Sequence, residues 1–141
     1  MEEDEKWFSA ALSVKSIAIT PDEIEAFFSI KPTRKHYIGD AVSNRNPRNK
    51  HKSHYYCVHS GCSSEEPMEN HLENILSLFG GVSKKVKELS KTEEVVLFCG
   101  FSSGNSQGGF TLSPELLLKL STFGVAWSLD LYPPSEAFDV E

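Results

Sequence analysis

Two stretches near the ends of the chain alternate apolar and polar side chains with a period of two. They span residues 7–14 and 125–132. Successive side chains of an extended strand point to opposite faces, so each stretch predicts a strand that is buried on one side only. The apolar positions are Phe8, Ala10, Leu12 and Val14 in the first stretch, and Val125, Trp127, Leu129 and Leu131 in the second. We therefore expect a sheet with one covered face and one open face.

Four segments between these strands carry helix signals. Thr20 and Glu23 form a capping box before a short helix that ends near residue 28. Further helices are predicted over residues 67–79, 82–89 and 113–124. Their apolar faces can cover one side of a sheet but do not suffice for two. The main side chains involved are Ile24, Phe27, Phe28, Met68, Leu72, Ile75, Phe79, Val86, Leu89, Leu116, Leu117, Leu120 and Phe123.

Three more strands are expected, over residues 54–59, 94–101 and 110–112. The stretch 94–101 is apolar on both faces, which favours an interior strand, and it can form a hairpin with 110–112. The expected fold is therefore a single α+β domain over residues 1–141. It has a mixed sheet of about five strands with helices packed mainly on one face. Flexible acidic termini and a long basic loop at 39–53 complete it, with residues 41–52 mobile or held mainly by polar contacts.

The charge of the chain is unevenly spread. The net charge is −6, yet residues 31–54 contain seven of the 14 basic residues and one of the 20 acidic ones. That segment carries +6 and the rest of the chain −12. An acidic body argues against nucleic-acid binding. An anion or nucleic-acid site within 31–54, using Arg34 and Arg48, remains as an alternative.

The sequence favours a cytoplasmic protein. It opens with acidic residues rather than with the basic start of a secretory signal, and no apolar run approaches the length of a membrane span. Three cysteines, Cys57, Cys62 and Cys99, make an odd set. We expect reduced thiols, and no association with a membrane.

Histidine and cysteine are densest between residues 51 and 62. Strand periodicity places Cys57 and His59 on one face and His54 on the other, so we expect no zinc site. Residues 104–109 are rich in glycine but lack the lysine of a phosphate-binding loop. No cofactor and no catalytic residue are assigned. A small enzyme that uses Cys57, His59 or Asp130 is the alternative.

The residues expected on the open face mix small, polar and aromatic types. They are Ser9, Ser13, Lys15, Tyr55, Cys57, His59, Ser128, Asp130 and Tyr132. Tyrosine and histidine combine an apolar body with a polar tip, a character enriched where proteins meet partners. Tyr55, His59, Asp130 and Tyr132, together with Arg34 and Arg48, are the candidate binding residues. The partner is a protein, a second copy of the chain or a small ligand.

The order of short motifs resembles a bacterial family catalogued as a domain of unknown function, number forty-two seventy-nine. The motifs are Thr20-Pro21-Asp22-Glu23-Ile24, Ile30-Lys31-Pro32-Thr33-Arg34 with Gly39-Asp40, Tyr56-x-Val58, His71-Leu72, Gly100-Phe101-Ser102-Ser103-Gly104-Asn105 with Gly108-Gly109, Leu112-Ser113-Pro114-Glu115-Leu116 and Leu129-Asp130-Leu131-Tyr132-Pro133.

The resemblance covers most of residues 8–133 and implies an α+β domain with no assigned activity. Tyr56 and Cys57 stand where the family commonly has tryptophan and serine, so Cys57 and Cys62 look particular to this chain. The leading hypothesis is a non-catalytic binding module in a bacterial cytoplasm.

Overall fold

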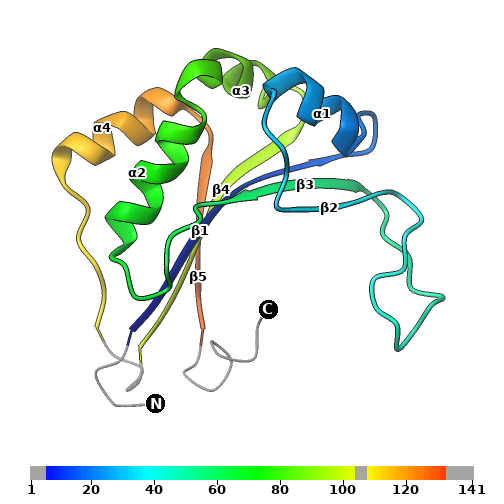
Figure 1. Ribbon diagram of the computed structural model, residues 1–141, viewed down its shortest axis with the longest axis horizontal. Coiled ribbons are helices and arrows are strands. Elements are labelled where there is room, and N and C mark those ends of the chain that lie inside the picture. The colour runs from blue at the N-terminus through cyan, green and yellow to red at the C-terminus, as the bar shows by residue number, and fades with distance from the viewer. Residues whose placement is uncertain (1–5, 104–107, 133–141) are drawn as a thin grey trace.

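The computed structural model describes residues 6–103 and 108–132, and it has the α+β fold expected from the sequence. The strands are β1 (Lys6–Ser16), β2 (Arg34–His36), β3 (His54–His59), β4 (Glu94–Ser103) and β5 (Ala126–Leu131). The helices are α1 (Pro21–Phe28), α2 (Met68–Leu78), α3 (Ser83–Leu89) and α4 (Pro114–Phe123), with a single 3₁₀ turn at Gly80–Val82. Figure 1 shows the four helices together on one side of the sheet.

The five strands form one mixed sheet in the order β2-β3-β1-β4-β5. β1 pairs antiparallel with both β3 and β4, and β3 pairs antiparallel with β2. β5 runs parallel to β4, which is possible because α4 carries the chain back across the sheet between them. The longest strand, β1, therefore lies at the centre, and β4 is the interior strand that its apolar sequence predicts.

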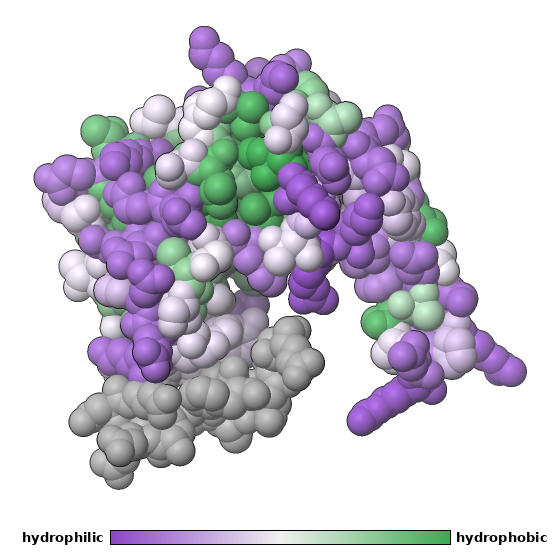
Figure 2. Space-filling model, in the orientation of Figure 1, coloured by the Kyte–Doolittle hydropathy of each residue, from purple (hydrophilic) through white to green (hydrophobic). Residues whose placement is uncertain are grey.

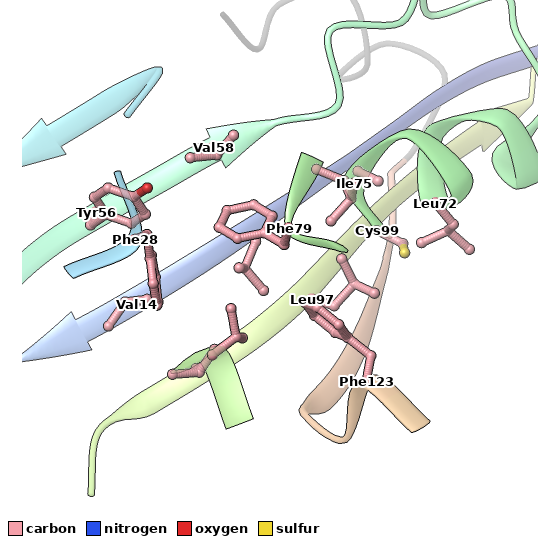
Figure 3. Packing of buried hydrophobic residues seen from close by; sticks show 14 of the residues in the cluster. Val14, Phe28, Tyr56, Val58, Leu72, Ile75, Phe79, Leu97, Cys99 and Phe123 are labelled. Carbon is pink, nitrogen blue, oxygen red and sulfur yellow. The ribbon is translucent and has the colours of Figure 1, made fainter. Parts of the chain in front are cut away.

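The core lies between the helices and one face of the sheet. Leu12 and Val14 of β1 are fully buried, and Leu97 of β4 is nearly so. The apolar stripe predicted for 67–79 is confirmed, because Met68, Leu72, Ile75 and Phe79 are all buried. Figure 3 shows the labelled members of this set, among them Leu72, Phe79 and Leu97, between the helices and the strands.

Aromatic rings fill the part of the core beneath α1. The ring of Phe28 makes edge contacts with Tyr56, at 5.8 Å between centroids, and with Phe79, at 5.7 Å. The buried hydroxyl of Tyr56 donates to the Ile30 carbonyl at 2.7 Å. This bond satisfies a polar atom that would otherwise cost free energy inside the core.

The helix starts follow the signals in the sequence. Thr20 Oγ1 accepts from the Glu23 N–H at 3.2 Å, and the Glu23 carboxylate accepts from the Thr20 N–H at 3.2 Å. Ser113 Oγ accepts from the Leu116 N–H at 3.1 Å at the start of α4. Both caps satisfy N–H groups that have no partner within the first turn of a helix.

The predicted strand at 110–112 is wrong. Residues 108–113 form no strand, and the partners of β4 are β1 and β5 instead of a hairpin neighbour. Phe110 is still held, because its ring contacts Phe101 at 5.7 Å and Phe8 at 6.4 Å between centroids. Packing of one ring on the core thus replaces the ladder that the strand prediction implied.

The short strand β2, which no sequence pattern predicted, introduces a hairpin that projects from the body. Beyond β2 and β3 the two chain segments stay hydrogen-bonded, with Gly39 N–H donating to His51 O and Val42 N–H to Asn49 O. The side chains from Ile38 to Lys50 are exposed. Figure 2 shows this largely hydrophilic hairpin standing away from the rest of the molecule. The basic segment is therefore a two-stranded arm held by backbone bonds.

Three side chains expected to face the core are largely exposed. Trp127 and Leu131 lie on the helix side of the sheet, but their exposed fractions are 44% and 71%, because β5 lies at the edge of the sheet that the described strands form. Leu117 of α4 is 52% exposed, since the buried stripe of that helix runs through Leu116 and Phe123. The periodicity identified the correct face of β5 but not the limit of the helix layer.

No helix in the described part of the chain is both long enough and apolar enough to cross a membrane.

Candidate functional site

The candidate site is the sheet face opposite the helices, which we call the open face. In a sheet, residues paired across strands share a face. Ser13 pairs with Cys57 and with Val96, and Gly100 pairs with Ser9 and with Asp130. The nine residues predicted to face outward therefore do lie on one face, and none of the described helices covers it. Two of them, Ser13 and Cys57, are nevertheless buried, with exposed fractions of 6% and 2%, because larger neighbours surround them.

The middle of the open face consists of small residues around one exposed ring. The side chains of Ser9, Ala11 and Ser13 of β1 are short, so they project little above the backbone of the sheet. Phe98 of β4, paired with Ala11, stands above them with 38% of its surface exposed. Phe98 was not predicted as a site residue, because an apolar side chain in an apolar strand is expected to be buried.

An aromatic pair occupies the β5 end of the open face. The rings of Trp7 and Tyr132 meet edge to face at 5.5 Å between centroids. They pass over Gly100, where a Cβ would lie 3.0 Å from the Trp7 ring and 3.1 Å from the Tyr132 ring. Tyr132 Oη donates to Asp130 Oδ2 at 3.5 Å, and partial burial and the Asp130 charge raise the pKa of Tyr132. Glycine at this position is what lets the two rings meet.

A stack of three rings occupies the opposite end. His36 lies between His51 and Tyr55, at centroid distances of 3.4 Å and 5.0 Å and nearly parallel to both. Desolvation, and then the positive charge of a protonated His51, lower the pKa of His36. Arg34 lies two residues before His36 on β2, on the same face, and is paired with Cys57 of β3. Its guanidinium is exposed. This end therefore offers flat aromatic surface with positive charge beside it.

The Cys57 thiol and the Tyr55 phenol, both at this end of the open face, are held in their protonated forms. Burial raises the pKa of the Cys57 thiol, and burial and the neighbouring Cys57 raise the pKa of Tyr55 well above its ordinary range. Desolvation and the Arg34 charge lower the pKa of His59. A buried neutral thiol is a poor nucleophile, since the thiolate is the reactive species.

The six residues predicted as binding residues fall into three places. Tyr55, His59 and Arg34 lie at the β2–β3 end of the open face, whereas Asp130 and Tyr132 lie at the β5 end. Arg48 lies on the projecting hairpin, where its N–H donates to Asn46 Oδ1 at 3.2 Å. β1 and β4 separate β3 from β5, so Cys57 and Asp130 are at least roughly 14 Å apart at the usual strand spacing.

Within the described ranges, no group of three or more His, Cys, Asp or Glu residues is arranged to hold a metal ion. His54 points to the helix side and its Nδ1 accepts from the Ile38 N–H at 3.1 Å. His71 is buried, with Nδ1 2.7 Å from Ser60 Oγ. The three cysteines are free thiols.

A concave feature lies on the helix side, between α1 and α3. It is an apolar groove of about 380 Å³. It is lined by Ile19, Glu23, Ile24, Phe27, Glu88, Leu89 and Thr92. The Glu23 carboxylate at its rim is already engaged in the α1 cap. None of the residues predicted for binding lines this groove.

Fold and site together define a small α+β protein with one helix-covered sheet face and one open, partly aromatic face. The chain belongs to the family described as "Domain of unknown function (DUF4279)", whose model matches residues 5–134. The family resemblance found in the motifs is thereby confirmed. No curated protein and no solved structure matches the chain.

Proposed function

We propose that the protein is a non-catalytic binding module that holds another protein on its open face, in a bacterial cytoplasm. The observation that carries the proposal is Phe98, a large ring left 38% exposed in the middle of a sheet face. Small side chains surround it, so a partner surface can approach the strands closely. Exposed aromatic residues bordered by polar ones are typical of protein interfaces.

The charges indicate the kind of partner. Arg34 is exposed at the β2–β3 end of the face, and the hairpin next to it carries Arg45, Arg48, Lys50 and Lys52. Asp130 is the acidic residue at the other end. A partner with an acidic region facing the hairpin and an apolar region facing Phe98 fits this arrangement. Complementary charge of this kind chiefly increases the rate and specificity of association.

The alternative, a small enzyme that uses Cys57, His59 or Asp130, has less support. Two strands separate Asp130 from the other two residues, and burial disfavours the Cys57 thiolate. Three groups that act on one substrate atom have to reach within hydrogen-bond distance of it. The intracellular location is proposed from the three free thiols, and the bacterial origin from the family resemblance.

A photocrosslinking amino acid placed at residue 98, in the native host, tests the proposal. We expect a covalent adduct with one defined protein from position 98, and none from position 78. Leu78 is the matched control, since it is 45% exposed but lies on α2, on the helix side. Asp130→Ala in the position-98 variant should weaken the adduct without loss of the fold. Adducts of equal yield from positions 98 and 78 would contradict the proposal.

A second candidate function follows from the hairpin alone. Residues 41–52 hold four basic side chains and no acidic one, on an arm that projects from the body. Such an arm suits a polyanion such as a nucleic acid. Titration with a labelled oligonucleotide at two salt concentrations tests it, with Arg48→Ala and Lys50→Ala as variants. Binding that weakens in both variants and at higher salt would favour this candidate over the first.

A further inference from the structure

β5 is an edge strand whose own six residues lack the features that normally protect an edge. It pairs with β4 on one side, and no described strand lies on its other side. Edge strands usually carry lysine, proline or a bulge that discourages pairing with another chain. The β5 sequence Ala-Trp-Ser-Leu-Asp-Leu has one charge, Asp130, and that side chain lies on the open face. The edge is therefore suited to accept another strand.

One hydrogen bond shows which backbone groups of β5 point away from β4. The Tyr132 N–H donates to the Phe101 carbonyl at 2.9 Å, so Tyr132 turns its backbone groups toward β4. N–H and C=O directions alternate along a strand. The backbone groups of Trp127, Leu129 and Leu131 consequently point away from β4, toward the free side.

The same three residues carry apolar side chains on the helix side of the sheet. Leu131 is 71% exposed and Trp127 44% exposed, while Leu129 packs partly against the core. The pattern is symmetrical about Leu129, since a large apolar residue lies two positions away on either side. A strand with this pattern is complementary to a second copy of itself running antiparallel.

We propose that a second copy of the chain pairs with β5 across a two-fold axis at Leu129. In this register Leu129 lies opposite Leu129 of the second copy, and Trp127 lies opposite Leu131. All three pairs exchange both N–H···O bonds, because their backbone groups are those that point outward. Asp130 lies opposite Ser128, so the two carboxylates do not face each other directly. The result is one continuous sheet across two copies.

The area required indicates that α4 also takes part. A stable dimer buries about 800 Å² per partner, which is more than the edge of a six-residue strand supplies. α4 packs on α2 and α3, and it is the element directly before β5 along the chain. Its Leu117 and Leu118 are 52% and 69% exposed. These leucines are exposed apolar side chains on the helix that leads into β5, and they are the additional surface that the dimer would use.

Sedimentation velocity of the full chain over a wide range of concentration is the first test. We expect a monomer–dimer equilibrium, and loss of the dimer in Leu131→Lys. The matched control is Leu78→Lys, an exposed leucine on α2, which should leave the dimer unchanged. Wild-type protein that stays monomeric at its highest soluble concentration, or a dimer that persists in Leu131→Lys, would overturn the proposal. So would a dimer that Phe98→Lys abolishes, since Phe98 lies on the open face.

Cysteine crosslinking tests the register without requiring a charged variant to fold. In a Cys62→Ser background, Leu129→Cys should form a disulfide-linked dimer under mild oxidation. Directly paired positions have Cα atoms about 5.5 Å apart, within disulfide range. Ser128→Cys is the control, because in this register residue 128 lies opposite residue 130. Equal crosslinking of the two variants, or linkage of Ser128→Cys alone, would show that the register is wrong.

Discussion

At Gly100 the absence of one side chain shapes an end of the open face. A Cβ there would lie 2.6 Å from Ser9 Oγ as well as against the Trp7 and Tyr132 rings. Gly100→Ala should therefore lower the free energy of unfolding by about 1–3 kcal/mol, the usual cost of overpacking. Urea denaturation measures it. Gly81→Ala is the control, since nothing lies within 4 Å of a Cβ at Gly81. A Gly100→Ala variant as stable as the control would mean that the rings move aside freely.

The three thiols should differ in reactivity. Cys57 is 2% exposed and Cys99 is fully buried, and burial raises the pKa of both thiols, that of Cys99 to about 11. Cys62 is partly exposed. We expect a maleimide reagent near neutral pH to modify Cys62 in the folded protein and the other two only after unfolding. Mass spectrometry of the labelled peptides reports the order. Rapid labelling of native Cys57 would instead support the enzyme alternative.

At the scale of single elements, α1 depends on its capping box. The helix has only eight residues, so the two reciprocal bonds between Thr20 and Glu23 are a large part of its local stabilisation. Thr20→Ala should cost about 1 kcal/mol of stability, whereas Thr20→Ser keeps the hydroxyl and should cost less. Chemical denaturation of the three proteins compares them. Equal losses in both variants would place the effect in the packing of the threonine methyl group.

For the molecule as a whole, histidine titration should make stability depend on pH. Desolvation lowers the pKa of His36, His59 and His71 below the ordinary value of 6.5. Each side chain therefore takes up a proton more readily in the unfolded chain than in the folded one. The free energy of unfolding should fall as the pH drops below about 6.5, before the carboxylates titrate near 4.

Urea denaturation between about pH 8 and pH 5.5 measures this dependence. His36→Gln should reduce it, because one of the three contributing groups is then absent. A free energy of unfolding that rises on acidification over this window would contradict the expected sign.

The strand and helix signals differ in how well they predicted the elements. Helix starts at Thr20 and Ser113 could be predicted because a cap and its partner lie three residues apart in the sequence. β2 could not, because its three residues Arg34–His36 are polar or charged and have no periodicity, and it exists through its ladder with β3. The opposite error occurred at residues 110–112, which were predicted as a strand but form no ladder.

By itself the sequence determined the faces of the strands. Period-two alternation is a local property, so Ser9, Tyr55 and Tyr132 could be placed on the open face before any contact was known. The tertiary structure decided which strands are neighbours and which strand lies at an edge. Those relations come from hydrogen bonds between distant segments, such as the pairing of β1 with β4. Position in the sheet is why Leu131 and Phe98 are exposed, while Cys57 is buried.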